Sequence, residues 1–196
     1  MDYVFEKGKF TEEQLELAII EVFQQQGYTY VHGEHIHRQY EDILIEDDLR
    51  SYLLTRYKDL SDVEVKKIIN KISLIQASPL YLGNRDTFWL INEGFDLQRD
   101  DISKVALHVD YIDYENPDNN IYKVVNQYSV QGERLRRPDL LLFINGIPVT
   151  ICEFKSAINE DTTVYDAWEQ VNKRYTRDIP KLMKYCFLSV ISDGAN

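Results

Sequence analysis

Two apolar runs separated by Asn145-Gly146 constrain the fold of this chain more strongly than any other feature. The runs cover residues 140–144 and 147–152. An Asn-Gly pair between two strand-like runs is a strong signal for a β-hairpin, because both residues tolerate the positive φ angles of a tight turn. The runs are almost continuously apolar instead of alternating, which is typical of strands covered on both faces. We therefore expect a hairpin in the interior of the fold.

Charged side chains lie at the ends of this hairpin, where apolar residues would be expected. Asp139 begins the first strand, and Glu153 and Lys155 end the second. Residues two apart on a strand point to the same face, so Glu153 and Lys155 share one face while Phe154 points to the other. Charges at a buried strand end are costly unless they pair with one another or hold a metal.

These charges have two interpretations. In the first, the acids and the lysine form a buried ion pair that only fixes the register of the hairpin. In the second, Asp139 and Glu153 provide hard oxygen ligands for Mg²⁺, and Lys155 lies beside the attacking water or the scissile phosphate. The order of Pro138-Asp139 and Glu153-Phe154-Lys155 resembles the signature of the PD-(D/E)xK nuclease superfamily. We favour the second interpretation because the motif falls at the ends of two buried strands.

A shared metal sets a condition on the hairpin. A two-residue turn without irregularity pairs Asp139 with Cys152 and points Asp139 and Glu153 to opposite faces. We therefore expect a connection of odd length or a β-bulge, with Gly146 in the left-handed region and Pro148 at the start of the second strand. Either device would place Asp139 opposite Glu153.

Length and composition indicate a globular protein. The chain has 196 residues, of which 44% are hydrophobic, and we expect one domain over residues 1–196 with a helical insertion at 47–94. No apolar run approaches the length of a membrane span, and no signal peptide begins the chain. Cys152 and Cys186 lie in apolar runs, which favours free thiols and a reducing cytoplasm.

The charge distribution is uneven. A net charge of −11 argues against a simple DNA-binding surface, because domains that bind nucleic acids are usually basic. Three arginines nevertheless precede the motif, and five basic residues stand against three acids between positions 165 and 184. These basic residues are Arg134, Arg136, Arg137, Lys173, Arg174, Arg177, Lys181 and Lys184. We expect a basic rim around an acidic metal centre, with firm DNA affinity supplied from elsewhere.

The first helix is predicted from Thr11 to about residue 26, because Thr11 and Gln14 form a capping box and Gly27 ends the pattern. At 100° per residue, its apolar arc consists of Leu15, Ala18, Ile19, Val22 and Phe23. Glu16 lies at the edge of this arc, so its carboxylate points near the core. This glutamate is either a partly buried capping or ion-pairing residue or a supporting residue of the site.

The remaining elements predict an α/β fold with a mixed central sheet flanked by helices. We expect strands at 28–38 (broken by Gly33), 105–113, 122–130 and 185–191, and helices at 47–57, 61–76, 84–92 and 164–176. His32, His35 and His37 lie in the first of these strands. Their spacing matches no usual zinc-ligand pattern and no cysteine is near, so we interpret them as surface or packed histidines.

Short segments distributed over the chain form a specific combination. They are Asn126-Gln127, Arg137-Pro138-Asp139, Phe143-Ile144-Asn145-Gly146-Ile147-Pro148, Glu153-Phe154-Lys155-Ser156, Ala167-Trp168-Glu169-Gln170, Asp178-Ile179-Pro180-Lys181-Leu182 and Ser192-Asp193-Gly194. Glu16, the segment 26–28 and the helix pair at 47–76 add to them. Over nearly the full chain, this combination resembles the N-terminal endonuclease domain of the R subunit of type I restriction enzymes.

The resemblance implies a restriction-endonuclease-like fold and Mg²⁺-dependent hydrolysis of DNA. Asp139 and Glu153 would be the metal ligands and Lys155 the catalytic lysine, while Glu16 and Gln170 would support them. In that family an ATP-driven DNA translocase follows the nuclease domain, so ATP would be bound by the full-length protein and this chain would be a fragment. The implied partners are double-stranded DNA and the methyltransferase (modification) and specificity subunits of the same cytoplasmic system.

The sequence departs from the family at a Gln-x-x-x-Tyr element. Tyr175 follows Gln170 by five residues, and Arg174 occupies the expected position of the tyrosine. On an α-helix, i and i+5 are rotated by about 140°, so we expect Gln170 at the edge of the site and Tyr175 in the core. Two alternatives stay open. One is a stand-alone RecB-like nuclease, and the other is a catalytically inactive docking module of the same fold.

Overall fold

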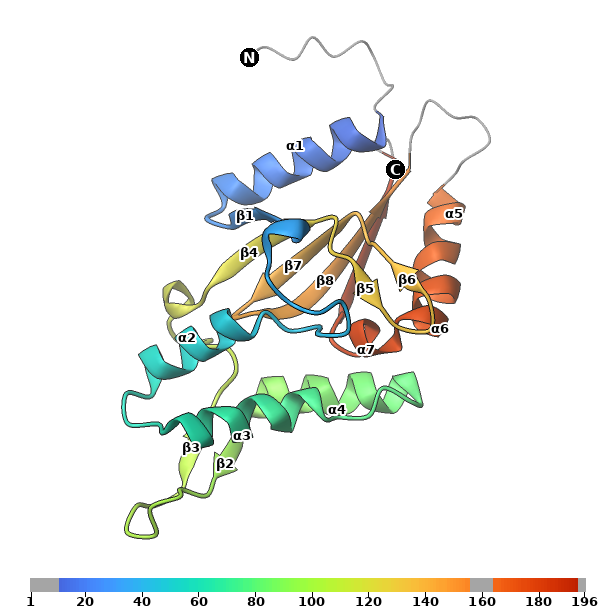
Figure 1. The fold of residues 1–196 in the computed structure, drawn as a ribbon. Coiled ribbons are helices and arrows are strands. Elements are labelled where there is room, and N and C mark those ends of the chain that lie inside the picture. The colour runs from blue at the N-terminus through green and yellow to red at the C-terminus, as the bar shows by residue number, and fades with distance from the viewer. Residues whose placement is uncertain (1–10, 156–163, 194–196) are drawn as a thin grey trace.

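The computed structural model describes residues 11–155 and 164–193. Its centre is a five-stranded mixed sheet with the order β1-β4-β7-β8-β9, which Figure 1 shows between helical layers. The strands are β1 (Thr29–His32), β4 (Tyr122–Asn126), β7 (Leu140–Ile144), β8 (Ile147–Phe154) and β9 (Leu188–Ser192). The pairs β1–β4 and β8–β9 are parallel, whereas β4–β7 and β7–β8 are antiparallel. The expected α/β class with a mixed, helix-flanked sheet is confirmed.

The predicted hairpin lies in the middle of this sheet. Four of the five residues of β7 and seven of the eight residues of β8 are buried. Asn145 and Gly146 both have positive φ, at 50° and 77°, as a type I′ turn requires. A Cβ at Gly146 would overlap the backbone carbonyl oxygen of Ile45, so this position needs glycine for close approach as well as for its φ angle.

A β-bulge in this hairpin sets the register at its open end. The turn pairs Ile144 with Ile147, but the register shifts after Phe143, so that Leu142 pairs with Thr150 and Leu140 with Cys152. The next step along the ladder places Asp139 opposite Glu153. The expected bulge is therefore confirmed, whereas the expected start of the second strand at Pro148 is wrong by one residue, because β8 begins at Ile147.

Helix α1 (Glu12–Gln25) covers one face of the sheet and has the predicted capping box at Thr11. It packs on a cluster that includes Leu140, Cys152 and Phe154. The expected apolar arc is partly wrong, because Ala18 and Val22 are exposed. The packed residues are Ile20, Leu15, Ile19 and Phe23. The helix is rotated so that Glu16, half-buried, lies within the packed face instead of at its edge.

The opposite face is covered by α2 (Glu46–Arg56), α3 (Asp62–Ser73) and the C-terminal helices, which share one large apolar cluster. A hairpin of β2 (Phe95–Leu97) and β3 (Leu107–Val109) follows α4 (Leu80–Glu93) and pairs apart from the central sheet. The prediction of a strand at 105–113 in the central sheet is therefore wrong, both in the length of the strand and in the sheet to which it belongs. The smaller elements are η1 (Gly33–His35), η2 (Pro117–Asn119), β5 (Val130–Gln131), β6 (Leu135–Arg136), α5 (Val164–Glu169), the π-helix η3 (Gln170–Tyr175), α6 (Thr176–Asp178) and α7 (Pro180–Met183). No helix among the described residues is long and apolar enough to cross a membrane.

Candidate active site

Glu153 is the centre of a polar cluster at the end of β8. Its side chain is only 1% exposed and accepts hydrogen bonds from three donors among the described residues. The Tyr175 hydroxyl donates to Oε2 at 2.9 Å, Lys155 Nζ donates to Oε1 at 3.1 Å, and the Gln170 amide also donates to Oε1. The Gln170 amide further donates to the Tyr175 hydroxyl at 2.7 Å. Buried carboxylates require such partners, because an unsatisfied polar group in the interior is costly.

Asp139 lies across the ladder from Glu153 at the start of β7. The backbone N–H of Phe154 donates to its Oδ2 at 2.7 Å. This contact follows from the bulge, because the shifted register brings the residue before Leu140 level with the end of β8. The structure thus brings together the two predicted acids, and Lys155 and Gln170 with them.

The two acids have raised pKa values. Burial is the main cause and raises the pKa of Glu153 to about 7, with a further contribution from the charge of Asp139, while Lys155 and Tyr175 act in the opposite direction. Burial likewise raises the pKa of Asp139 to about 6, against the lowering effects of the Phe154 N–H and Lys155. Two carboxylates beside one ammonium group leave excess negative charge in a desolvated place. The site is therefore electrostatically suited to a cation.

Lys155 is partly available for a ligand. Its side chain is 12% exposed, and its ammonium group donates to Glu153 and to the Phe154 carbonyl oxygen at 2.8 Å. A lysine ammonium has three N–H groups. Among the described residues, two of them are occupied by these contacts, and Glu12 Oε1 lies 4.0 Å from Nζ, beyond hydrogen-bond distance. One N–H thus remains to donate to a substrate oxygen or a water molecule.

Tyr175 joins the site, contrary to the expectation that it belongs only to the core. The residues Gln170–Tyr175 form a π-helix, not an α-helix. In a π-helix the hydrogen bonds run from i to i+5, which brings side chains five positions apart back to one side. The extra residue between Gln170 and Tyr175 is absorbed by this wider turn, and both side chains reach Glu153.

Glu16 lies beside the site but forms a separate contact group. Its carboxylate accepts hydrogen bonds from the side-chain amides of Asn126 at 2.7 Å and Gln127 at 3.3 Å, and the Tyr30 hydroxyl donates to the other end of Asn126 at 3.1 Å. The charge of Glu16 contributes to the raised pKa of Asp139. Sequence reasoning gave no role to Tyr30 or Asn126. A polar residue ending the buried strand β4 was the signal available for Asn126.

The donor set fits Mg²⁺. The described residues contain no group of three or more His, Cys, Asp or Glu side chains that could hold a metal ion, so a cation here depends on Asp139 and Glu153. Magnesium is commonly bound by one or two carboxylates, with water and substrate phosphate completing its shell. A carboxylate offers about four lone-pair positions, and within residues 11–155 and 164–193 the three donors to Glu153 leave one of them unused.

The basic rim is only partly where it was expected. Arg136 and Arg177 both bond the buried carboxylate of Asp178, and Lys173 pairs with Glu169. Lys184 is not part of a rim. It is buried, and its ammonium group donates to the carbonyl oxygens of Ser73 and Ile75 at the end of α3. Burial lowers the pKa of Lys184 to about 8.

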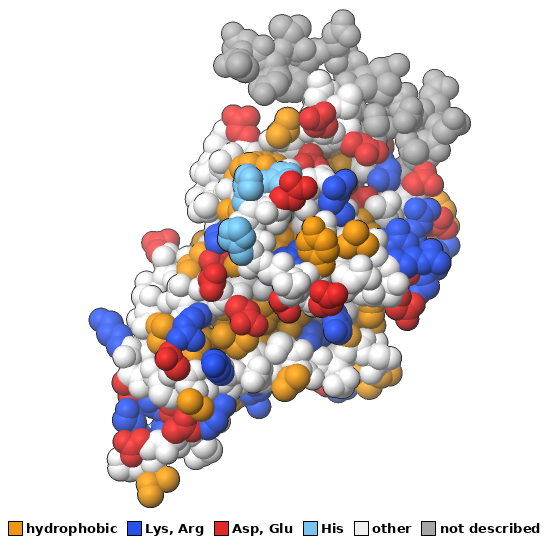
Figure 2. All heavy atoms as spheres, viewed as in Figure 1, with side chains coloured by type: hydrophobic (Ala, Val, Ile, Leu, Met, Phe, Trp, Pro, Cys, Tyr) orange, Lys and Arg blue, Asp and Glu red, His pale blue; other side chains and the backbone are white. Residues whose placement is uncertain are grey.

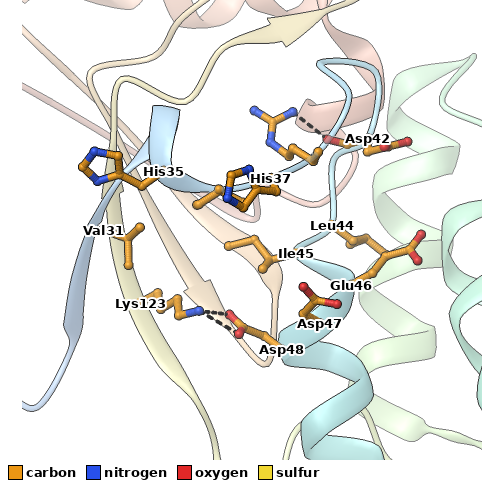
Figure 3. Close-up of a pocket in the computed structure, with 12 residues that line it drawn as sticks. Val31, His35, His37, Asp42, Leu44, Ile45, Glu46, Asp47, Asp48 and Lys123 are labelled. Atoms are coloured by element: carbon orange, nitrogen blue, oxygen red, sulfur yellow. Dashed lines mark hydrogen bonds and ion pairs between the residues drawn. The ribbon is translucent and has the colours of Figure 1, made fainter.

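The histidines lie around β1 and η1, and His32, which ends β1, pairs with Asn126 at the same end of the sheet as Asp139. His35 and His37 line a cavity of about 410 Å³ between β1 and the start of α2. In Figure 3, Lys123 points across this cavity to Asp48, and the two side chains form a hydrogen bond of 2.7 Å. No cluster of metal-ligand type forms there among the described residues.

The fold and the acid–lysine cluster define the class of the protein. A mixed α/β sheet with helices on both faces, and with two acids and a lysine at the end of its central hairpin, is restriction-endonuclease-like. Comparison with known families agrees. The model of the family "Type I restriction enzyme R protein N terminus" matches residues 9–196, and the chain belongs to this family.

Three curated relatives are all named as endonuclease subunits of type I restriction enzymes. The chain is 29% identical to a Methanocaldococcus jannaschii protein named "Putative type I restriction enzyme MjaIXP endonuclease subunit", over 96% of the chain and 19% of the relative. It is 23% identical to the type I restriction enzyme HindI endonuclease subunit of Haemophilus influenzae, over 93% of the chain and 18% of that relative. The type I restriction enzyme SsaAORF53P endonuclease subunit of Staphylococcus saprophyticus is 26% identical to the chain, over 92% of the chain and 18% of that relative. The chain thus spans about a fifth of the length of these relatives.

Proposed function

We propose that the chain is the Mg²⁺-dependent endonuclease domain of a type I restriction enzyme R subunit. It would hydrolyse phosphodiester bonds of double-stranded DNA after ATP-driven translocation by motor domains outside this chain. Its further partners would be the modification methyltransferase and specificity subunits of one cytoplasmic system. The proposal rests on family membership and on one observation, the convergence of Asp139, Glu153 and Lys155 at the open end of one hairpin.

In the proposed mechanism, Asp139 and Glu153 hold the cation. When bound, Mg²⁺ supplies polarisation of the phosphate and a lowered pKa of bound water. Tyr175 and Gln170 fix the orientation of Glu153 through their hydrogen bonds, and the Phe154 N–H fixes Asp139. Lys155 directs its third N–H to the attacking water or to the developing negative charge on the phosphate.

The test uses the full-length protein. Asp139→Ala, Glu153→Ala and Lys155→Ala should each abolish nicking of a supercoiled plasmid while DNA-stimulated ATP hydrolysis stays nearly intact. The double variants should be little worse than the single ones, because groups that act as a unit give non-additive losses. A Lys155→Ala protein that still cuts DNA would contradict the assignment.

An inactive docking module of the same fold is the competing proposal, because the ion pair between Lys155 and Glu153 could be purely structural. Calorimetric titration with Mg²⁺ or Mn²⁺ separates the two, since an ion-paired relic should bind no divalent cation. In that case Lys155→Ala should also cost several kcal/mol of stability, because it leaves buried carboxylates without their partner. A gene without a helicase continuation would favour a stand-alone RecB-like nuclease instead.

A further inference from the structure

The hairpin formed by β5 and β6 is bound to α6, which directly follows the π-helix that carries Gln170 and Tyr175. The carboxylate of Asp178, 1% exposed, accepts hydrogen bonds from Arg136 Nε at 2.8 Å and Arg177 Nε at 2.6 Å. The backbone N–H of Glu133 donates to the Asp178 carbonyl oxygen at 2.8 Å. A Cβ at Gly132 would overlap the same carbonyl oxygen. The hairpin and α6 therefore behave as one unit, with little freedom to move apart.

Three basic side chains in this hairpin, directly after it and in the neighbouring π-helix η3 have no ion pair with any other residue that the structure describes. Arg134, Arg137 and Arg174 are exposed, and none of the ion pairs found among the described residues involves them. Asp178 is one negative charge shared by Arg136 and Arg177, and the nearby Glu133 is a second acid that acts on Arg177. In Figure 2, Lys and Arg side chains gather on the side of the molecule where Figure 1 shows α5 and α6.

Two of these arginines adjoin site residues along the chain, and Arg134 lies three residues before Arg137, in the turn of the β5–β6 hairpin. Arg137 is two residues before Asp139, so their Cα atoms lie within about 7 Å of each other. Arg174 immediately precedes Tyr175, whose hydroxyl bonds Glu153. A phosphodiester bound at Asp139 and Glu153 would thus lie near Arg137 and Arg174 along the chain.

We propose that Arg134, Arg137 and Arg174 form a phosphate-binding ridge that holds the backbone of duplex DNA next to the scissile bond. This inference rests on the proposed function and adds a substrate-binding surface to it. The chain as a whole carries a net charge of −11 and repels DNA, so attraction must be local to the site. Arginine suits this role because its planar guanidinium makes bidentate contacts with phosphate.

The experiment compares two charge-matched double variants of the full-length protein. Arg134→Gln/Arg137→Gln removes two positive charges from the ridge, and Lys58→Gln/Lys66→Gln removes two from exposed positions at α2–α3. Binding of a fluorescent 30-base-pair duplex is measured by anisotropy in EDTA over a series of salt concentrations. EDTA separates binding from cleavage, so the result does not depend on whether the metal site is catalytic.

The ridge variant should bind more weakly than wild type, and the slope of log K against log salt should fall by about 2. Each lost phosphate contact lowers this slope by about 0.9. The lysine variant should match wild type. Arg174→Gln provides an independent single variant, with an expected fall of about 0.9, and thermal melts verify that each protein is folded. All four side chains of the double variants are exposed, so folding should be preserved.

Equal slopes for the ridge, lysine and wild-type proteins would overturn the inference, even if Asp139→Ala abolishes cleavage and supports the proposed function. Unchanged DNA binding together with lost association with the other subunits in gel filtration would also overturn it, since the ridge would then contact an acidic protein surface. A reduced slope in a protein that never cleaves DNA would keep the ridge and reject the nuclease proposal.

Discussion

Replacing Asp139 by Asn should stabilise the metal-free protein at alkaline pH, although it removes a proposed ligand. Asn keeps a carbonyl oxygen for the Phe154 N–H and removes one of two neighbouring buried charges. The pKa of Asp139 is raised from 3.8 to about 6, so the folded state binds more protons than the unfolded state between these values. Stability is therefore lost as the pH rises through this range, and it is regained when the charge is removed.

The magnitude follows from the pKa. A rise from 3.8 to about 6 corresponds to about 3 kcal/mol at 1.36 kcal/mol per pKa unit. Asp139 is partly exposed, and solvent screens part of this effect, so we expect a gain of about 1–3 kcal/mol. For a chain of this length, that is an increase in Tm of about 2–10 °C.

The assay is thermal unfolding at pH 8 and pH 4 in EDTA, with the exposed Asp118→Asn as a control for the same chemical change. Asp139→Asn should melt higher than wild type at pH 8 and equally at pH 4, while Asp118→Asn should match wild type at both. Millimolar Mg²⁺ should raise the Tm of wild type but not of Asp139→Asn, because a ligand stabilises only the state that binds it. A lower Tm for Asp139→Asn at pH 8 in EDTA would refute the reasoning, since Asp139 would then be held in a stabilising ion pair.

Two further predictions concern neighbouring contacts. Tyr175→Phe removes the hydroxyl that donates to the site glutamate and should lower the rate of plasmid nicking about tenfold, the effect of about 1.4 kcal/mol; an unchanged rate would restrict this tyrosine to packing. Glu64→Ala leaves the buried side chain of Arg99 without its main partner and should cost about 3 kcal/mol in urea unfolding at pH 7. The hydrogen bond from Arg99 lowers the pKa of Glu64, so this stability difference should shrink as the pH falls below the ordinary range of a glutamate. A difference as large at pH 2 as at pH 7 would contradict the prediction.

The central hairpin was the part of the fold that the sequence specified best. The Asn145-Gly146 pair and the apolar runs around it are local signals, and local signals need no knowledge of the partner elements. The capping boxes that begin α1 and α3 were found for the same reason. Edges of the sheet were less predictable. Residues 105–113 are apolar enough for a central strand, yet only Leu107–Val109 forms a strand, and it pairs with β2. Tertiary contacts, which the local sequence does not reveal, determine this pairing.

Glu16 shows a second limit of sequence reasoning. Helical periodicity gives the apolar arc to within about one residue, and a rotation of that size moved Glu16 from the edge of the packed face of α1 into it. The carboxylate is tolerated there because Asn126 and Gln127 donate hydrogen bonds to it. These donors come from the end of β4, 110 residues later in the chain, and their proximity depends on which strand lies beneath the helix.

Two one-residue irregularities bring the candidate site together, and neither has a period that sequence analysis can detect. The bulge in β8 turns Asp139 to the face of Glu153, and the π-helix turns Tyr175 to the side of Gln170. The first could be deduced, because a shared site forbids the regular register. The π-helix could have been deduced in the same way. Gln170 and Tyr175 are five residues apart, so both can reach one carboxylate only if the helix widens locally. A regular helix was assumed instead, and that assumption, not the residues, placed Tyr175 in the core alone.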